Sequence, residues 1–212
     1  KVLTSINVSD MEEVALACYL LILLFTAQRP ETLPKTQDGF DDNKHLRLKD
    51  FCVKQGYVRI CFRNLKQDPL NLRAAARKGG GFAWRPIGNC TSPLFSVYVW
   101  YKKYLTFREA FNTDEEQPLF LDSGGRPLTY AKLNAVFHRL QRQICAEWDF
   151  SLGGMRSAAY VIISGVYGRE MAKEVGMWNS DCDKHYDREW TERVLSMPEY
   201  MARFAQSDKM PR

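Results

Sequence analysis

The chain has 212 residues, of which 45% are hydrophobic and 13% aromatic, and its 30 Lys and Arg residues against 25 Asp and Glu give a formal charge of +5. This composition supplies a substantial core for one or two domains and excludes intrinsic disorder and low-complexity repeats. The longest apolar run, Val14 to Phe25, is shorter than the roughly 20 residues that a membrane-spanning helix needs. We therefore expect a buried helix there and no membrane partner.

Local patterns predict one helix and three short strands in the first half of the chain. The helix begins at Ser9 or Asp10, either of which can cap it, and runs to about Gln28, where Pro30 prevents its extension. The strands are indicated by short apolar stretches, and the second of them alternates apolar and polar side chains as a half-buried strand does. The expected strands cover residues 46–51, 57–64 and 82–87, the last two as antiparallel partners.

Helices dominate the second half. An aromatic-rich helix is expected over 92–107, and Thr129 is placed to cap a helix that runs to about Glu147. Further helices are expected over residues 153–166, 168–177, 179–190 and 197–205. The sequence therefore predicts a mainly α fold with a small antiparallel β-sheet (α+β), formed by a single domain over 1–212.

The net charge is unevenly distributed along the chain. Between Lys44 and Arg85 there are eleven basic residues and two acidic ones, so this window carries +9 and the remainder carries −4. A run of charge often forms only a solvated face, but concentrated basic charge is also the expected footprint of a polyanion. The candidate DNA contacts in this window are Lys44, Arg63, Arg73, Arg77, Lys78 and Arg85.

The motifs of several common enzyme classes do not occur. The six cysteines form no C-x-x-C pair and there are three histidines, so zinc-ligand spacing is lacking and no cofactor is expected. We expect reduced thiols and an intracellular location. The glycines at 79–81 lead into a strand pattern rather than into Lys-Ser/Thr, which favours a hairpin tip over a phosphate loop. Hydrolase, metalloprotease and dinucleotide-binding interpretations have no supporting motif.

An ordered set of polar residues is more informative. Arg29 ends the apolar helix, Lys66 follows the alternating strand, and Arg156 lies in the run Gly-Gly-Met-Arg that opens a later helix. Trp178 and Tyr186 lie eight residues apart near the C-terminal end of the chain. Each has an ordinary structural explanation: an ion pair with the neighbouring glutamate or a surface position for Arg29, an exposed hairpin lysine for Lys66, and core packing for the two aromatics.

Taken in order, these segments resemble the catalytic domain of the tyrosine recombinases, the integrase family of Cre and phage lambda integrase. The resemblance runs over essentially the whole chain and includes the connection Pro118-Leu119-Phe120 with Gly125 to Thr129. The Trp-x-Ser-Asp run with a tyrosine eight residues on looks most like eukaryotic DIRS-type and Crypton-type transposon recombinases. The family's His-x-x-Arg motif is represented by Gly153 and Arg156, so glycine stands in the place of its histidine.

The resemblance implies site-specific cleavage and rejoining of double-stranded DNA through a 3′-phosphotyrosine intermediate. Tyr186 would be the nucleophile, Arg29 and Arg156 would hold the phosphate, Lys66 would protonate the departing oxygen, and Trp178 would donate its indole N–H. Such recombination needs no metal or cofactor. With Gly153, the proton of the nucleophile would pass to water, to the phosphate or to an unrecognised group, and cleavage would be slower.

The same resemblance implies partners and a location. We expect a nuclear protein that acts as a homotetramer on DNA, with the helix over 197–205 either exchanged between protomers or packed on its own chain. The N-terminal domain that completes the DNA clamp is expected to be absent from residues 1–212.

Two other interpretations remain open at this stage. The chain is alternatively a recombinase-fold DNA-binding protein, architectural or regulatory, that has lost catalysis, and Gly153 favours this. It is otherwise an unrelated helical protein, in which the aromatic helix over 92–107 docks a protein partner or simply packs in the core.

Overall fold

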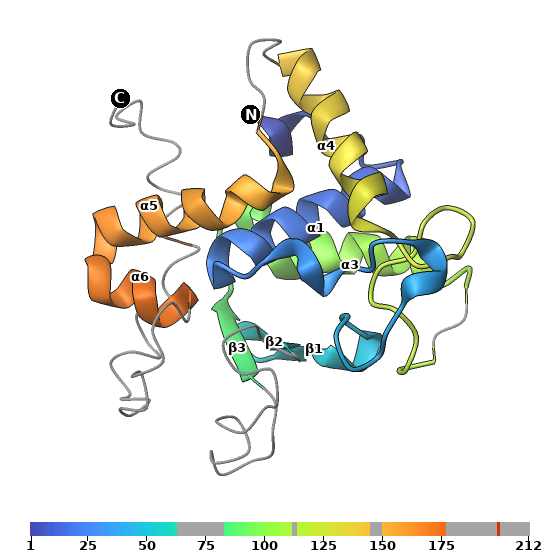
Figure 1. Ribbon diagram of the computed structural model, residues 1–212, viewed down its shortest axis with the longest axis horizontal. Coiled ribbons are helices and arrows are strands. Elements are labelled where there is room, and N and C mark those ends of the chain that lie inside the picture. The colour runs from blue at the N-terminus through green and yellow to red at the C-terminus, as the bar shows by residue number, and fades with distance from the viewer. Residues whose placement is uncertain (63–82, 112–113, 145–149, 177–198, 200–212) are drawn as a thin grey trace.

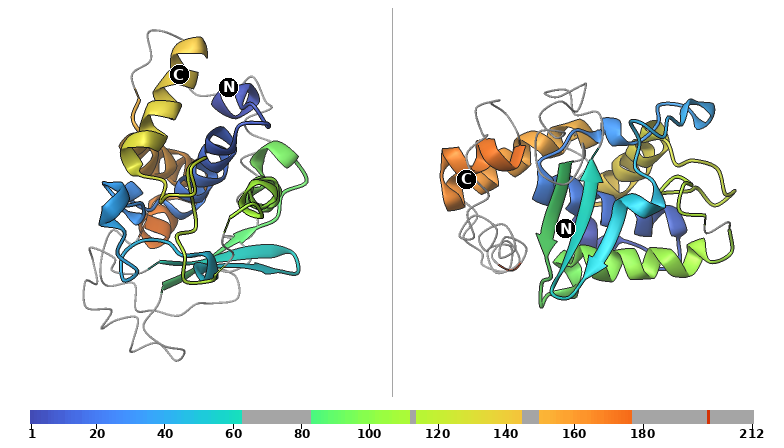
Figure 2. Two further views of the ribbon diagram at one scale, coloured as in Figure 1. Left: turned by 90° about the vertical axis from the view of Figure 1, so that its right-hand side faces the viewer. Right: turned by 90° about the horizontal axis from the view of Figure 1, so that it is seen from below.

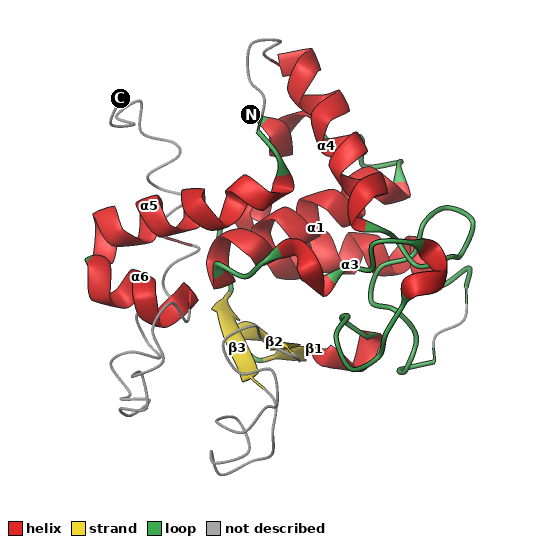
Figure 3. Ribbon diagram, in the orientation of Figure 1, coloured by secondary structure: helices red, strands yellow, loops and turns green. Residues whose placement is uncertain are grey.

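A layer of helices covers a small sheet (Figures 1 and 3). The computed structural model describes residues 1–62, 83–111, 114–144, 150–176 and 199. Its helices are α1 (Met11–Thr26), α3 (Val97–Arg108), α4 (Tyr130–Ile144), α5 (Met155–Tyr167) and α6 (Arg169–Gly176). Its strands are β1 (Phe51–Lys54), β2 (Tyr57–Phe62) and β3 (Ala83–Gly88). Short 3₁₀ turns lie at Val2–Ser5, Pro30–Thr32, Gln37–Gly39, Leu48–Asp50, Pro93–Phe95 and Leu152–Gly154. The mainly α fold with one small antiparallel sheet is confirmed.

α1 is the central helix, with α3, α4 and α5 packed around it and α6 packed on α5. Asp10 caps it by accepting hydrogen bonds from the backbone N–H groups of Glu12 (2.9 Å) and Glu13 (3.1 Å). Nearly every residue of α1 is buried, which confirms the expected buried helix. It ends at Thr26, two residues earlier than expected, because Ala27 takes the left-handed conformation with φ 48°.

The three strands form an antiparallel sheet in the order β1-β2-β3, which lies across one side of the helical layer (Figure 2). The alternation predicted for the second strand is confirmed from Tyr57 to Ile60, where Val58 and Ile60 are buried and Tyr57 and Arg59 are half-buried, but it ends at Cys61, which is buried as well. The expected strand over 46–51 is wrong in position, because β1 begins only at Phe51. A 3₁₀ turn at Leu48–Asp50 precedes it, where the Asp50 carboxylate accepts a hydrogen bond from the Arg47 N–H (2.9 Å).

The aromatic side chains of α3 belong to the core. The helix begins at Val97 rather than at 92, because Ser96 caps it by accepting a hydrogen bond from the Val99 N–H (3.3 Å). The Trp100 indole donates to a backbone carbonyl (3.0 Å), and the Tyr104 hydroxyl accepts from the Leu121 N–H (2.6 Å). Both aromatic residues are at most 5% exposed, and Tyr98 and Phe107 of the same helix are half-buried against the core, so the aromatic side chains of this helix form core and rim.

The later helices begin and end close to their expected residues. Thr129 caps α4 by accepting a hydrogen bond from the Lys132 N–H (3.2 Å), as expected. α5 and α6 match the helices expected over 153–166 and 168–177 to within two residues. The expected helix over 179–190 and the glycines at 79–81 lie outside the described residues. No helix in the described ranges combines the length and the apolar character needed to cross a membrane. The described cysteines, Cys18, Cys52, Cys61 and Cys90, are free thiols.

A buried carboxylate ties the start of α4 to the turn before it. Asp122 is fully buried and accepts hydrogen bonds from the backbone N–H groups of Gly124 (2.9 Å) and Arg126 (3.0 Å) and from the Lys132 ammonium (3.2 Å). Burial by itself would raise the pKa of Asp122, but these hydrogen bonds outweigh it and hold the pKa below its ordinary value. The folded protein therefore stabilises the ionised carboxylate.

We expect Asp122→Asn to lower the free energy of unfolding at pH 7 by about 2 kcal/mol, because hydrogen bonds to a charged group are lost. A folded-state pKa below the unfolded value contributes stability that is present at neutral pH and is lost as the pH falls below about 4. Urea unfolding at pH 7 and at pH 3 measures this. The difference between wild type and variant should shrink at pH 3, and Asp38→Asn, at an exposed site, should change stability little at either pH. An equal difference in stability between wild type and Asp122→Asn at both pH values would contradict the lowered pKa of Asp122.

Candidate active site

Arg29 follows the end of the central helix and has no counter-ion among the described side chains. The left-handed turn at Ala27 takes the chain off the helix axis, and Arg29 follows in an extended conformation (φ −80°, ψ 147°). A left-handed alanine costs roughly 1–2 kcal/mol relative to a helical one. The guanidinium is half-buried and its Nε is buried without a hydrogen-bond partner. Among the described side chains no carboxylate pairs with Arg29, and the expected partner Glu31 has a side chain outside the described ones.

A small second core brings α5 and α6 against this end of α1. Ala27 is fully buried in a cluster with Ala159 and Ile163 of α5 and with Ala172 and Val175 of α6. This cluster is separate from the main core around α1. Because Ala159 lies one helical turn after residue 156, the cluster holds the first turn of α5 at the end of α1 that carries Arg29.

Arg156 stands in that first turn and is half-buried. The backbone reaches it through the 3₁₀ turn Leu152–Gly154, which is fixed by a hydrogen bond from the Leu152 N–H to the Asn134 side-chain oxygen (3.1 Å). The first-turn N–H groups of α5 are not capped by a side chain. Unpaired N–H groups give this helix end a partial positive charge, which adds to that of Arg29 and Arg156.

Gly153 is exposed, and the space beside it is lined by hydroxyl groups. A Cβ placed on Gly153 would lie 3.4 Å from the Ser151 Oγ and 3.9 Å from the Tyr130 hydroxyl oxygen. These are ordinary contact distances, so the position can accept a side chain. Sequence reasoning missed Tyr130, because no pattern links the first residue of α4 to the turn before α5.

The fold around these residues is shared with solved recombinases. No family model and no curated protein matches the chain. It is similar to the XerH site-specific recombinase bound to its difH substrate in a pre-cleavage complex, with 18% identity and a TM-score of 0.54 over 92% of this chain and 50% of that one. It is also similar to XerH bound to palindromic difH in a post-cleavage complex, with 17% identity and a TM-score of 0.53 over 98% of this chain and 49% of that one.

The chain has the fold of a tyrosine recombinase catalytic domain. It spans about half the length of the XerH chains that it matches. The possibility of an unrelated helical fold is thereby removed.

Part of the basic window on this recombinase fold is neutralised by acids. Lys44 is exposed and pairs with Asp41 (2.7 Å). Arg47 is 7% exposed and pairs with Glu116 (2.6 Å), which also binds Lys49. The excess positive charge of the window therefore comes from the residues after Lys49.

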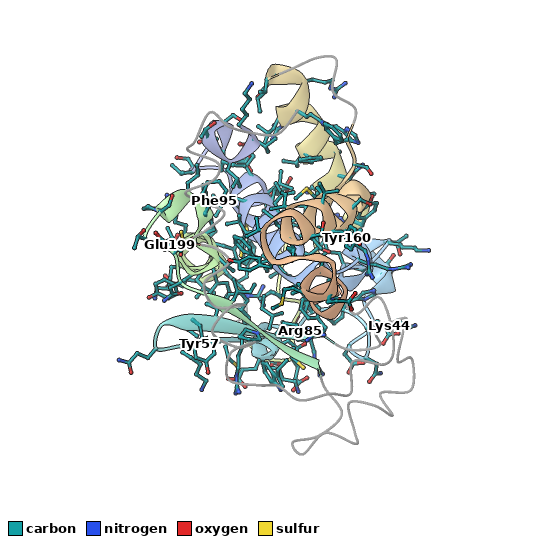
Figure 4. All side chains as sticks on the ribbon, turned by 90° about the vertical axis from the view of Figure 1, so that its left-hand side faces the viewer. Lys44, Tyr57, Arg85, Phe95, Tyr160 and Glu199 are labelled. Atoms are coloured by element: carbon teal, nitrogen blue, oxygen red, sulfur yellow. The ribbon has the colours of Figure 1, made fainter. Side chains whose placement is uncertain are left out.

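The Arg85 side chain extends from the sheet into the interior and not to the surface. It lies opposite Ile60 in the β2–β3 register and is 6% exposed, on the side of the sheet that faces the helices (Figure 4). On the neighbouring strand, the Arg59 guanidinium stacks over the Trp84 ring at 4.4 Å. A buried Arg85 can add positive potential to the site but does not form part of an open surface patch.

The remaining candidate site residues lie outside the described residues. They are Lys66, Trp178 and Tyr186 of the expected catalytic set, and Arg63, Arg73, Arg77 and Lys78 of the expected DNA contacts. Of the expected helix over 197–205, Glu199 is described, and its carboxylate accepts hydrogen bonds from the Thr91 N–H and hydroxyl (both 2.8 Å) of the same chain. In the described ranges, no group of three or more His, Cys, Asp or Glu side chains is placed to bind a metal.

Proposed function

We propose that this chain cleaves and rejoins DNA strands at specific sites through a 3′-phosphotyrosine intermediate. The observation that carries the proposal is Arg29, a half-buried cation without a described counter-ion, held beside the helix turn of Arg156 in a tyrosine recombinase fold. A pair of arginines suits a phosphodiester, because each guanidinium offers a planar fork of N–H donors and stays charged at any working pH.

The cleavage step balances as a transesterification. The Tyr186 phenol loses its proton to water or to the phosphate, and its oxygen attacks phosphorus. The bond from phosphorus to the 5′-oxygen breaks, and that oxygen takes a proton from the Lys66 ammonium. A 3′-phosphotyrosine and a free 5′-hydroxyl result. Attack by the 5′-hydroxyl of another strand reverses every bond change and returns the proton to Lys66.

Arg29 and Arg156 would act on the charge that builds up on the non-bridging oxygens as phosphorus becomes five-coordinate. Donors that are already in place at that moment need no reorganisation, and this is usually the largest single contribution to catalysis. Trp178 would donate its indole N–H to the same group. The site would thus bind the transition state more tightly than the intact DNA strand.

DNA is also the partner that the charge distribution favours. The XerH structures similar to this chain are complexes with DNA, and the basic excess of this chain lies in residues after Lys49, where Arg63, Arg73, Arg77 and Lys78 would contact phosphates. Nuclear location and tetramer formation belong to the same proposal. Exchange of the C-terminal helix between protomers would require the contact between Thr91 and Glu199 to be remade on a second chain.

A second candidate, a recombinase-fold DNA-binding protein without catalysis, is favoured by Gly153. A glycine there provides no side-chain group to accept the nucleophile's proton. The two candidates make the same prediction for DNA binding and opposite ones for a covalent product.

We expect the 212-residue chain to form an adduct with DNA that survives denaturation, and Tyr186→Phe to form none, because only the phenol oxygen can bond to phosphorus. The assay incubates protein with a pool of nicked duplexes of randomised sequence, in which the short strand beyond the cut diffuses away and traps the intermediate. Adducts are separated on a denaturing gel and their DNA is sequenced.

Tyr98→Phe is the matched control, because Tyr98 is a half-buried tyrosine on α3, and it should form the adduct as wild type does. Binding measured in parallel separates the two candidates. DNA binding without an adduct would favour the non-catalytic protein, and neither binding nor adduct would refute both.

A further inference from the structure

The start of α4, which carries Tyr130, is joined to both segments that carry the arginines. The Tyr130 N–H donates to the Pro34 carbonyl (2.9 Å), which joins the start of α4 to the segment that follows Arg29. One turn later on α4, Asn134 accepts a hydrogen bond from the Leu152 N–H in the turn before Arg156. The backbone of Tyr130 is therefore held close to the backbone of both segments.

The Tyr130 hydroxyl has no hydrogen-bond partner among the described residues, and Tyr130 is half-buried. The nearby Tyr19 differs in both respects: it is fully buried, and its hydroxyl is bonded to the Pro30 carbonyl (3.0 Å) and the Thr32 hydroxyl (2.8 Å). Tyr19 is thus a structural group, whereas Tyr130 has a donor available for a ligand.

The open space at Gly153 leads to this donor. The Tyr130 oxygen is 3.9 Å from the point that a Cβ of residue 153 would occupy, and Gly153 itself is exposed. A group bound at the first turn of α5 would therefore lie close to the phenol oxygen.

We infer that Tyr130 is a further catalytic residue, whose hydroxyl donates a hydrogen bond to a non-bridging oxygen of the scissile phosphate. A neutral phenol is a hydrogen-bond donor and a phosphate oxygen is an acceptor, so the pairing is chemically matched. The proton stays on Tyr130 throughout, and no bond to this residue forms or breaks. The inference rests on the proposed function, because it requires a phosphodiester between Arg29 and Arg156.

The test compares the rate of adduct formation by wild type and Tyr130→Phe on a duplex recovered from the adduct assay. Loss of one preorganised donor should slow adduct formation by about 10²–10³-fold, with the thermal unfolding midpoint and the DNA affinity unchanged. Tyr98→Phe is again the control and should react at the wild-type rate. A Tyr130→Phe protein that reacts as fast as wild type would overturn the inference and leave the proposed function standing.

A sulfur substitution separates a direct contact from a structural effect. The scissile phosphate is prepared as each of its two phosphorothioate diastereomers, which replace one non-bridging oxygen by the poorer acceptor sulfur. If Tyr130 donates to that oxygen, the rate penalty of Tyr130→Phe should largely disappear on one diastereomer and persist on the other. An equal penalty on both would show an indirect role and overturn the inference. Failure of wild type to form any adduct would instead mark failure of the proposed function, and the inference would fall with it.

Discussion

Arg156→Ala is expected to slow formation of the DNA adduct by about 10³–10⁵-fold, the range found where a single arginine stabilises a phosphoryl-transfer transition state. Arg156 stands in the first turn of α5, which the small core cluster holds beside Arg29. Its removal would leave Arg29 as the only arginine of the proposed site against the charge on the phosphate. The rate is measured with protein in excess over nicked duplex, so that a single turnover is followed.

Two comparisons test whether the slower rate of Arg156→Ala reflects loss of the planar guanidinium at the phosphate. Arg156→Lys keeps the charge but loses the planar fork, so its rate should fall between those of wild type and Arg156→Ala. The DNA affinity of all three proteins should differ far less than their rates, because one phosphate contact among many contributes little to binding. A rate for Arg156→Ala within a few-fold of wild type would be incompatible with the proposed site.

Gly153→His is expected to accelerate adduct formation, by about 10²–10⁴-fold if the imidazole takes the proton of Tyr186 as a general base. The structure allows the change, because the new Cβ would meet the Ser151 and Tyr130 oxygens at ordinary contact distances of 3.4 and 3.9 Å. The exposed position leaves room for the ring. The resemblance to tyrosine recombinases implies a histidine at this place, so the substitution would restore a group that the fold can accommodate.

The pH dependence of the rate shows whether the imidazole causes the acceleration by Gly153→His. A histidine acts as a base only when neutral, so the rate of the variant should fall as the pH drops below about 6.5, and the rate of the wild type should show no such limb. Gly153→Ala adds the Cβ without the base and should show no acceleration. If the alanine and histidine variants react equally fast, proton transfer does not limit cleavage.

Local patterns were sufficient to predict most of the fold. The apolar run of α1, the alternation at the start of β2 and the cap at Thr129 are each determined by residues close in sequence, and the structure confirms them. The position of β1 was not predictable in this way. Arg47 pairs with Pro118 in an isolated bridge. Because of this distant contact and the turn at Leu48–Asp50, β1 begins only at Phe51.

In the candidate site, too, some features follow from the sequence and others depend on tertiary contacts. Arg29 and Arg156 could be chosen from the sequence because the resemblance supplied the order of the motifs. The left-handed conformation of Ala27 could not be predicted, since alanine ordinarily favours a helix. The approach of Tyr130 to Gly153 depends on how α4 meets the turn before α5, which is a matter of tertiary packing. Sequence therefore proposed the charged groups of the candidate site, whereas the inferred role of Tyr130 required the structure.

The separate small core has a consequence for regulation. The buried apolar residues of α6, Met171, Ala172 and Val175, all belong to the small cluster and none to the main core. Segments held by few buried contacts open at a fraction of the free energy of global unfolding. Local opening of α6 would leave Arg29 in place on the central helix but would remove half of the cluster that holds the first turn of α5. Under the proposed function, the pairing of Arg29 with Arg156 would then depend on the stability of α6 and would be lost without unfolding of the main core.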